Sequence, residues 1–512
     1  MKVVIIGSGI AGMTAGAYLS RYGCAVTVLE QNDDIGGVTG GFTRDGYSWD
    51  MGQLVLEGFG PGEQAGIVLE ELGVLEQIVT ERSDRTYVFP DMTIRPPEKY
   101  AGTWWRKDFL AERFPAERKG LDRYYRMYVR FMKLITIARK AERAKGLSAF
   151  ALKVKLYATL LPLVPRIRWS AQKMSDYLFT DNRLKAIFIS ILADFVVRPS
   201  QFPGLGIPAV NPEPAFDRRV PLDIAPGTKQ PSYRLVQGGC RTIIDALAGA
   251  IKARGGRIIT GVVATRIMIE NNMVKGVLCG DGSRYDADLV LASGGAKEAF
   301  LDLVGKELLP KKFAAHIESI PLMQSILMVH LGIDFDPRPF QKDAVCYYYR
   351  TYDVEEAVDN LQKGVYHEGN DGFLIYIPSI FSNTSAPAGK YAVTVYTVAP
   401  NTLNKGSWSD RKEELADTLL RFAEEIIPGL RAGARTKTVF TPEDFRARTH
   451  LKHHAFGGCA PVMGTKGAPH RTPVRGLWFI GAQSESGAGM NNVVEGAWRA
   501  ARMIMKENSI PG

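Results

Sequence analysis

The stretch Val3-Val4-Ile5-Ile6-Gly7-Ser8-Gly9-Ile10-Ala11-Gly12 decides the fold of this 512-residue chain. Its four consecutive branched apolar residues predict a short, buried parallel strand that ends at the first glycine. Residues 13–22 then predict a helix and residues 25–29 a second strand, which runs into Glu30. A strand, a glycine-rich turn, a helix and an acid at this distance are typical of a dinucleotide-binding βαβ unit.

The glycine-rich turn has a predicted role at each position. Gly7 permits the tight strand-to-helix turn, Gly9 lets the backbone approach a pyrophosphate, and Gly12 lets the helix pack closely on the strand. At the helix start, Ile10 and Ala11 present unpaired N–H groups and the positive end of the helix dipole to phosphates. The turn is therefore predicted to hold the diphosphate of a dinucleotide.

An acid and a second glycine pair favour FAD as this dinucleotide. Glu30, with Gln31 beside it, is expected at the adenosine ribose, where a carboxylate accepts hydrogen bonds and would repel the 2′-phosphate of NADP. Gly36-Gly37 follows closely. Many FAD proteins continue the cradle with such a pair, whereas plain NAD dehydrogenases usually lack it. The alternative is a glycine-rich surface turn.

The C-terminal stretch 476–506 is expected to hold the flavin ring. A strand that ends at Gly481-Ala482 is followed by small residues and then by a helix. Met490, Asn491 and Val493 at the helix start can direct N–H groups toward the N1–C2=O edge of the flavin, where the reduced ring carries negative charge. A C-terminal docking helix without cofactor contact is the alternative.

The middle of the chain predicts a second part of the same domain and a separate sheet. A helix is expected over 241–254, and strands are expected at 257–259, 262–269, 274–279 and 289–291. The Asp281-Gly282 turn indicates a hairpin. In two-dinucleotide flavoproteins such a meander places Val263 at the adenine side of FAD, while a core without ligand contact is the alternative. Strand-like runs between 320 and 400 indicate an antiparallel sheet, the usual substrate layer of such enzymes.

The formal charge of +10 is concentrated in one segment, because residues 104–173 contain 18 Lys or Arg and 5 Asp or Glu. Five cations with helical spacing form one basic stripe: Arg123, Arg126, Arg130, Lys133 and Lys140. The apolar stretch 147–164 follows it. This pattern predicts a helix pair on an anionic bilayer surface, with a solvated helix packed on the core as the alternative. Nucleic acid is not expected as a partner, since nothing else resembles a binding module.

No stretch of the sequence is expected to cross a bilayer, because the longest apolar run is interrupted at Pro162. The first strand follows Met1 and Lys2 directly, so a cleaved signal is not expected either. The five cysteines are scattered, which predicts reduced thiols. We expect a cytoplasmic protein that associates peripherally with the cytoplasmic membrane.

The predicted fold class is α/β: a two-dinucleotide-binding, Rossmann-like FAD domain with an antiparallel-sheet substrate domain and a helical membrane-associating insertion. Residues 1–95, 201–310 and 451–512 are assigned to the three parts of the FAD-binding domain. The basic helical insertion is expected over 96–200 and the substrate domain over 311–450.

Several blocks occur together and in order: Gly7 to Gly12, Glu30, Gly36-Gly37, Gly238-Gly239, the Asp281-Gly282 meander and residues 481–496. This set resembles the FAD-dependent phytoene desaturase, carotenoid isomerase and retinol saturase family, within the wider flavin amine oxidase-like group. The resemblance implies non-covalent FAD, an apolar isoprenoid or carotenoid-like lipid substrate, the membrane surface as a partner, and hydride exchange at flavin N5. Quinone or oxygen would be the electron acceptor.

The last block departs from that family, because Ser486-Gly487-Ala488-Gly489 stands where a Pro-Gly-Gly-Gly run is usual. Two alternative functions therefore stay open. One is an amine-oxidase-type flavin oxidase of a smaller polar substrate, in which Cys459 after Gly457-Gly458 would resemble a covalent flavin attachment site; simple packing of Cys459 is the prediction. The other is a non-enzymatic prenyl-lipid carrier similar to Rab escort proteins, although the retained glycine clusters and Glu30 disfavour it.

Four of the seven histidines lie close together in the sequence: His450, His453, His454 and His470. A metal site would need carboxylate or thiolate partners at a suitable spacing, and Cys459 alone is near, so no metal is predicted. Places beside the substrate pocket and ordinary loop positions both stay open for these histidines. The sequence assigns no catalytic acid or base, and it leaves the direction of the reaction open.

Overall fold

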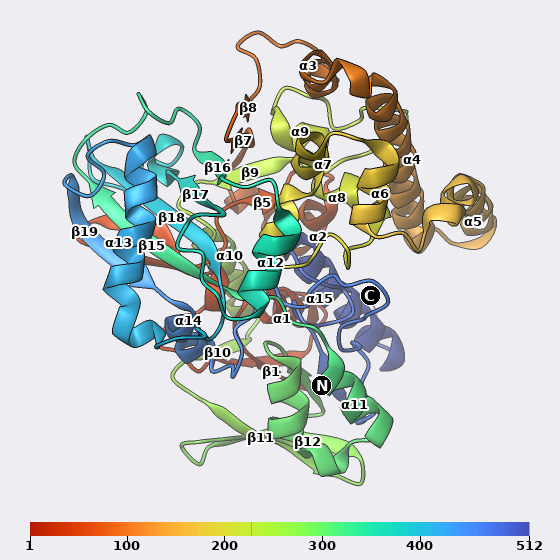
Figure 1. The fold of residues 1–512 in the computed structure, drawn as a ribbon. Helices are drawn as coiled ribbons and strands as arrows, with labels where there is room; N and C mark the ends of the chain where they lie inside the picture. Colours follow the sequence, from red (N-terminus) through yellow and green to blue (C-terminus); the bar gives the residue numbers. More distant parts are fainter. Residues whose placement is uncertain (227, 511–512) are drawn as a thin grey trace.

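An all-parallel five-stranded sheet forms the centre of the dinucleotide-binding part of the computed structural model, which describes residues 1–226 and 228–510 (Figure 1). Its strands in spatial order are β10 (Arg257–Ile259), β2 (Ala25–Leu29), β1 (Lys2–Ile6), β14 (Leu289–Ala292) and β20 (Leu477–Phe479). Because the strands are parallel, the ends of β1, β2, β14 and β20 meet at one edge of the sheet. Ligands of open α/β sheets bind outside such an edge.

The two faces of this sheet are covered differently. Val3 and Ile5 of β1 pack against the helices α1 (Ile10–Arg21), α10 (Arg241–Lys252) and α15 (Met490–Glu507), with α2 (Gln64–Leu72) beside α15. Val4 points to the other face, which is covered by a three-stranded meander, by the π-helical segment η7 (Glu298–Gly305) and by α11 (Lys311–Ser319). The meander consists of β11 (Ala264–Glu270), β12 (Met273–Cys279) and β13 (Arg284–Asp286).

A second, seven-stranded sheet lies beside the first, with α13 (Trp408–Ile426) and α14 (Pro442–Thr449) packed on it (Figure 1). In spatial order its strands are β19 (Ala434–Phe440), β15 (Ser325–Ile333), β18 (Tyr391–Ala399), β17 (Gly372–Tyr376), β16 (Val345–Tyr349), β7 (Thr86–Phe89) and β8 (Met92–Ile94). The pair β16 and β7 is parallel, and the other pairs are antiparallel. The expected antiparallel sheet is therefore present, but residues 86–94, which were assigned to the first FAD-binding part, also belong to it.

Smaller elements connect the two sheets. A hairpin is formed by β3 (Gly41–Arg44) and β4 (Tyr47–Asp50), and a three-stranded sheet by β5 (Leu56–Glu57), β9 (Tyr233–Val236) and β6 (Thr80–Arg82). Helix α12 (Val354–Gln362) lies in the sequence between β16 and β17 of the seven-stranded sheet. One expected boundary shifts for a local reason: β11 begins at Ala264 instead of 262, because the Val262 N–H donates to the Glu30 carbonyl at 2.9 Å.

Residues 105–216, which include most of the basic segment, form a mainly helical body beside the seven-stranded sheet, at the upper right of Figure 1. Its helices are α3 (Trp105–Arg113), α4 (Arg118–Arg143), α5 (Gly146–Leu160), α6 (Ala171–Leu178), α7 (Asn182–Ile189), α8 (Ile207–Val210) and α9 (Glu213–Phe216). On α4, Tyr124 and Tyr128 are buried while Arg126 and Arg130 are exposed, so the expected basic stripe faces solvent. A fully buried ion pair between Arg106 and Glu213, 2.6 Å apart, ties α3 to α9.

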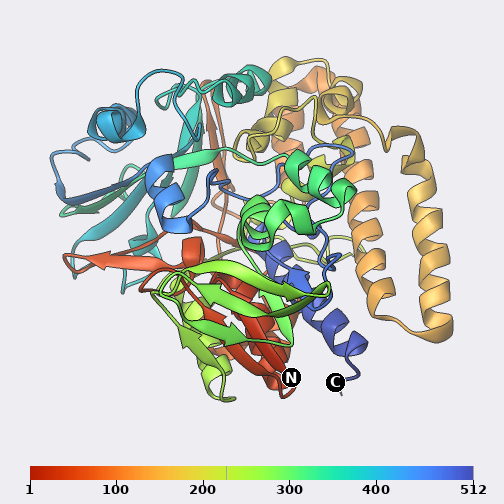
Figure 2. The ribbon, with the colours of Figure 1, turned by 90° about the horizontal axis from the view of Figure 1, so that it is seen from below.

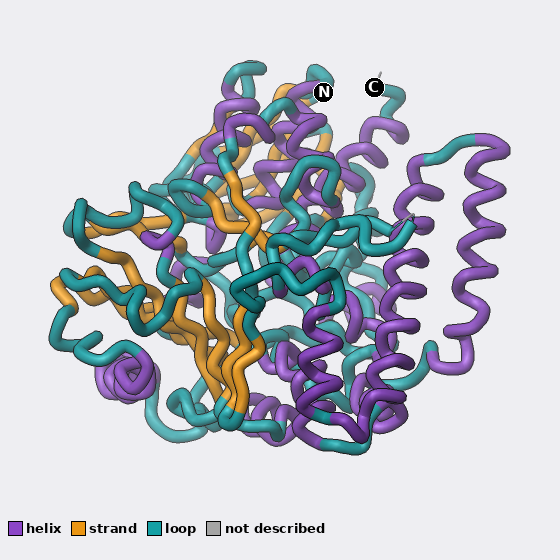
Figure 3. The backbone as a smooth tube through the Cα atoms, turned by 90° about the horizontal axis from the view of Figure 1, so that it is seen from above, coloured by secondary structure: helices purple, strands orange, loops and turns teal. Residues whose placement is uncertain are grey.

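Helices α4 and α5 form a long pair, and α5 is its outer member, as Figures 2 and 3 show from opposite sides. The run Gly146–Arg166 continues from α5 into a 3-10 segment, η4 (Leu161–Arg166), with Pro162 in its first turn. A proline there leaves few hydrogen bonds unmade. Within this 21-residue run a window of 18 residues has a mean hydropathy of 1.5, so by length and composition the run could cross a membrane. The expectation that Pro162 would leave no run of that length was therefore wrong.

Candidate cofactor-binding site

The turn between β1 and α1 has open space in front of it. Gly7 adopts a φ of 97°, which glycine tolerates and other residues rarely adopt. A Cβ on Gly9 would meet no atom within 4 Å, whereas a Cβ on Gly12 would lie 2.0 Å from the Gly7 carbonyl oxygen. Gly9 caps α1 without any side-chain hydrogen bond. The first N–H groups of α1 are thus free to bind an anion.

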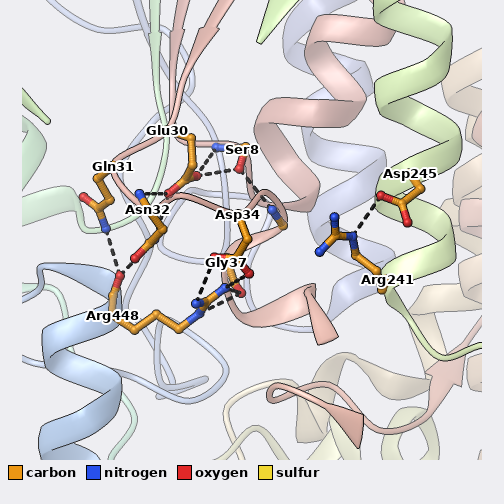
Figure 4. Close-up of polar contacts among 10 residues, drawn as sticks. Ser8, Glu30, Gln31, Asn32, Asp34, Gly37, Arg241, Asp245 and Arg448 are labelled. Carbon is orange, nitrogen blue, oxygen red and sulfur yellow. Dashed lines mark hydrogen bonds and ion pairs between the residues drawn. The ribbon is translucent and has the colours of Figure 1, made fainter. Parts of the chain in front are cut away.

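The Glu30 carboxylate holds this turn against the end of β2 (Figure 4). Its Oε2 accepts from the N–H and the hydroxyl of Ser8, at 2.9 and 2.5 Å, and Oε1 accepts from the N–H and side-chain amide of Asn32, at 3.0 and 2.8 Å. The Ser8 hydroxyl also accepts from the Gly36 N–H at 3.0 Å. These donors occupy the carboxylate fully, so a ribose hydroxyl would replace one of the side-chain donors.

The loop after Glu30 is clamped by the end of α14, as Figure 4 shows. The Arg448 guanidinium donates to both carboxylate oxygens of Asp34, at 3.0 and 3.2 Å, and to the Gly37 carbonyl. In the other direction, the side-chain amides of Gln31 and Asn32 donate to the Arg448 carbonyl, at 3.0 and 3.2 Å. Helix α14, which packs on the seven-stranded sheet, thereby supplies one wall of the dinucleotide-binding edge.

The C-terminal loop closes the opposite end. β20 leads through Ile480 into Gly481, whose φ is 108°, and the Ala482 carbonyl accepts from the Cys459 N–H at 3.1 Å. Gly489 precedes α15 and caps it without a side-chain hydrogen bond. Like α1, the 18-residue helix α15 therefore begins with N–H groups free for a ligand.

One cavity of about 480 Å³ joins these two ends of the chain. Thirteen of the fifteen residues expected to contact the cofactor line it: Gly7, Gly9, Ile10, Ala11, Glu30, Gln31, Gly36, Gly37, Val263, Gly481, Ala482, Met490 and Val493. Gly7, Gly9, Ile10 and Ala11 thus face the same space as Met490, more than 470 positions later in the chain. Their individual contacts with FAD stay predictions.

Gly12 and Asn491 do not line the cavity. Gly12 packs α1 onto β1, which is the role expected for it, since any side chain would collide with Gly7. Asn491 instead faces α2: its side-chain amide donates to Gln64 at 3.5 Å and lies beside Gly58. The helical turn at 490–493 rotates Asn491 away from Met490 and Val493, so its side chain is better assigned to helix packing.

The cavity fits FAD in shape and chemistry. A Cβ on Gly294 at the end of β14, like one on Gly9, would meet nothing within 4 Å and would fill the cradle instead. Uncapped helix starts at residues 10 and 490 face the cavity, suited to the diphosphate and to an electron-rich ring edge. Glu30 and Val263 lie near one another at the expected ribose and adenine end.

Sequence reasoning missed Arg448 and Gln53, which line the cavity. His454, for which the sequence leaves a place beside the substrate pocket open, and Phe456, which precedes Gly457-Gly458, line it too. Arg448 and Gln53 belong to no glycine motif and are brought to the site by the path of the chain. A single polar residue in such a segment carries no local signal that distinguishes it from its neighbours.

The clustered histidines do not form a metal site. Within residues 1–226 and 228–510, no group of three or more His, Cys, Asp or Glu side chains could hold a metal ion. His450 and His454 line the cavity. His453 and His470 are bonded to backbone carbonyls, of Met323 and Phe479 respectively, each at 2.8 Å.

Cys459 is a packing residue. It belongs to the core cluster that includes Val474 and Phe479, and burial raises the pKa of its thiol to about 12. Its neighbour Gly458 lines the cavity, but Cys459 does not. This arrangement agrees with the predicted packing role and not with a covalent link to flavin.

The fold and the cavity define a dinucleotide-dependent oxidoreductase. A sequence model described as flavin-containing amine oxidoreductase matches residues 10–505, so the chain belongs to that family and FAD is its cofactor. The chain is therefore an enzyme, which sets aside the non-enzymatic carrier.

Relatives refine the comparison. Prolycopene isomerase 1 of an Oncidium hybrid cultivar is 23% identical over 503 residues, covering 95% of this chain and 81% of that protein. The 4,4′-diapophytoene desaturase of Staphylococcus aureus is 22% identical and covers 97% of both chains. An oxidoreductase structure from Methanosarcina mazei has a TM-score of 0.64 at 20% identity and covers 98% of this chain and 100% of its own. The predicted resemblance to carotenoid desaturases and isomerases is confirmed.

Proposed function

We propose that this enzyme transfers hydride to or from, or isomerises, carbon–carbon bonds of an apolar isoprenoid or carotenoid-like lipid, which it takes from the cytoplasmic face of an anionic membrane. The names of the relatives support the substrate class. The observation that carries the membrane part is the apolar outer face of α5. Bound FAD would accept or return the hydride.

The outer face of α5, continued by Leu161 at the start of η4, is an apolar stripe in contact with solvent. Leu147, Phe150, Val154, Tyr157 and Leu161 recur at three- and four-residue intervals and are 54 to 89% exposed. Burying one such side chain gains about 1.5–3 kcal/mol, so leaving five in water is costly for a soluble protein. A helix of this kind is stabilised when its apolar face enters the headgroup boundary of a bilayer.

Both helices of the α4 and α5 pair also carry exposed cations. Lys153 and Lys155 on α5, and Arg126 and Arg130 on α4, are exposed. Each Lys or Arg near an anionic surface contributes about 1 kcal/mol to binding. Arg123 differs, because its guanidinium donates to the carbonyls of Tyr177 and Leu178 at the end of α6. The basic surface is therefore narrower than the sequence stripe.

An apolar core connects the α4 and α5 pair with the cofactor cavity. The buried face of α4, including Tyr124 and Met132, packs in the same cluster as Ile326 and Phe445, and both of these line the cavity. Phe456, another lining residue, packs against this cluster and lies 5.9 Å from the Tyr396 ring. This packed core joins α4 to two walls of the cavity and excludes water from the space between them.

Extraction of the protein from its native host, followed by mass spectrometry of the bound lipid, tests this function. We expect a long isoprenoid or polyene, and anaerobic addition of that lipid should change the flavin absorbance. An amine-oxidase-type enzyme would instead release hydrogen peroxide with a small amine and would show no change with any isoprenoid.

A further inference from the structure

His454 is a buried polar side chain in the cavity for which neither the sequence nor the family assigns a role. It follows α14 in the loop that continues with Ala455 and Phe456, which line the same cavity. It is 3% exposed. Ala482 and Met490, the residues expected at the flavin end, line the same cavity.

Three contacts fix the orientation of His454. Its Nδ1 lies 2.8 Å from the Ser325 hydroxyl, and its ring stacks on Phe445 with centroids 4.8 Å apart and an interplanar angle of 10°. Its backbone N–H donates to the Asn401 side-chain oxygen, and its carbonyl accepts from the Asn401 amide, both at 2.9 Å. The side chain is held by a hydroxyl and a ring, and its backbone by an amide, so the imidazole presents one defined edge to its surroundings.

The edge that remains is Nε2. Burial lowers the pKa of His454 to about 3, so the ring is neutral at ordinary pH and carries one proton. Nδ1 is bonded to Ser325, and Nε2 has no hydrogen-bond partner among the described residues. A ring nitrogen that carries a proton is stabilised when it finds a hydrogen-bond acceptor. A ligand in the cavity can supply the missing partner.

We propose that His454 donates a hydrogen bond from Nε2–H to an acceptor atom on the edge of the flavin ring, while the Ser325 hydroxyl donates to Nδ1 and holds this tautomer. The loop that bears it also places Gly457 and Gly458 on the cavity wall. A neutral donor at this edge stabilises the negative charge of the reduced ring and raises its reduction potential. This inference concerns the FAD site and does not depend on the lipid substrate.

His453 offers a matched comparison. It is the adjacent histidine, but it does not line the cavity. Its Nε2 lies 2.8 Å from the Met323 carbonyl and 3.1 Å from the Asn401 amide, so its ring is used within the protein. Replacing it changes the same loop without removing a group from the cofactor.

The test compares His454→Gln, which keeps an amide donor near the Nε2 position, with His454→Asn, which keeps only a group near Nδ1 for Ser325. We expect H454N to lower the flavin midpoint potential and to weaken FAD binding about tenfold, the size of one well-placed hydrogen bond. H454Q should stay close to wild type in both, and H453N should change neither. Equal potentials in H454N and wild type, or equal shifts in H454N and H454Q, would overturn the proposal.

Nitrogen-15 NMR of histidine-labelled wild type provides a second test that needs no stable His454 variant. The H453N spectrum identifies the neighbouring signals. On addition of FAD to the apoprotein, we expect the Nε2 resonance of His454 to move as its proton gains an acceptor, and that of His453 to stay. An unchanged His454 Nε2 signal would exclude the contact, whatever the activity of the loaded enzyme.

Discussion

Arg448 Nη2 lies 3.0 Å from Asp34 Oδ2, although the two residues are 414 positions apart. The ion pair joins the end of α14, which packs on the seven-stranded sheet, to the glycine loop of the dinucleotide-binding unit. The same guanidinium donates to the Gly37 carbonyl, so it fixes both the charge and the backbone of that loop. The part of the chain built on the seven-stranded sheet therefore takes part in shaping the cofactor site.

Arg448→Met should weaken FAD binding about tenfold, because it frees the loop around Gly37 and leaves Asp34 without its cation. Fluorescence titration of the apoprotein with FAD measures this. The control is Arg241→Met, which breaks the exposed ion pair with Asp245 on α10 (2.8 Å, Figure 4). Arg241 does not line the cavity, so similar losses in both variants would contradict a specific role for Arg448.

Gly9→Val should abolish flavin binding without unfolding the protein. Gly9 has an ordinary φ of −61°, and its missing Cβ faces open space, so a side chain is tolerated by the protein and excluded only by a cofactor. We expect a colourless protein with a near-normal melting temperature and FAD affinity reduced at least about a hundredfold. Gly249→Val on α10 also meets open space and should stay yellow. A yellow G9V protein would show that the diphosphate lies elsewhere.

The βαβ unit can be predicted from sequence because each of its residues answers a local requirement. Gly7 needs its left-handed φ, and Gly12 has no room for a side chain. Such constraints are written into neighbouring residues and need no knowledge of the rest of the chain. The same holds for the Asp281-Gly282 turn between β12 and β13.

Other parts depend on contacts that sequence patterns do not contain. Strand β7 joins the seven-stranded sheet by pairing with β16, some 260 residues later, and its short apolar run gives no sign of that partner. Arg448 and His454 reach the cavity because α14 packs on the seven-stranded sheet and also contacts residues 37–39 of the glycine loop. Pro162 predicted a break, yet the chain continues as a 3-10 helix, because a proline in a first turn costs little.

Asp50 should make the protein less stable as the pH rises from about 4 to 7. Burial raises the pKa of its carboxyl to about 7 from an ordinary 3.8, despite the hydrogen bond from the Cys240 N–H. The folded state then binds the proton more tightly, so this stabilisation is complete below pH 4 and is lost as the pH approaches 7. Asp50→Asn removes the titration and keeps the acceptor oxygen.

The unfolding free energy of D50N relative to wild type should therefore increase with pH over that range, by at most about 1.4 kcal/mol per pH unit. Urea unfolding at several pH values measures it. Asp245→Asn replaces an exposed carboxyl on α10, away from Asp50 on β4, and should give a nearly flat difference. A flat difference for D50N would mean that Asp50 is ionised in the folded protein.

His330 should make the protein less stable as the pH falls below 6.5, the opposite pH dependence to that of Asp50. Burial among Phe42, Trp49 and Phe440 lowers its pKa to about 3 from 6.5. The stability that its neutral ring contributes is complete above pH 6.5 and is lost as the pH falls toward 3. His330→Asn keeps a partner for Thr394 without titrating.

Wild type should consequently lose its stability advantage over H330N as the pH drops from 6.5 to 4. Thermal or urea unfolding at several pH values measures this difference. His450 is exposed at the end of α14, and His450→Asn should show no comparable trend. If the H330N difference does not change with pH, the folded protein must accommodate a charged His330.

The apolar stripe of α5 should be required for binding to anionic membranes. Phe150 and Tyr157 are 68 and 69% exposed, and they lie about two helical turns apart on the same face of α5. Replacing both with Asp removes the burial of two aromatic rings and adds two charges that the surface repels. We expect the partition of F150D/Y157D into vesicles of phosphatidylglycerol and phosphatidylcholine to fall on the order of a hundredfold in flotation.

The matched control, V79D/L308D, places the same two charges at exposed apolar positions outside the α4 and α5 pair. Val79 and Leu308 are 60 and 46% exposed. This control should float like wild type. High salt should weaken the wild-type interaction without abolishing it, since salt screens the cations of α4 and α5 but not the apolar contact. Equal flotation of both double variants would show that α5 does not face the lipid and that its stripe is covered by something else.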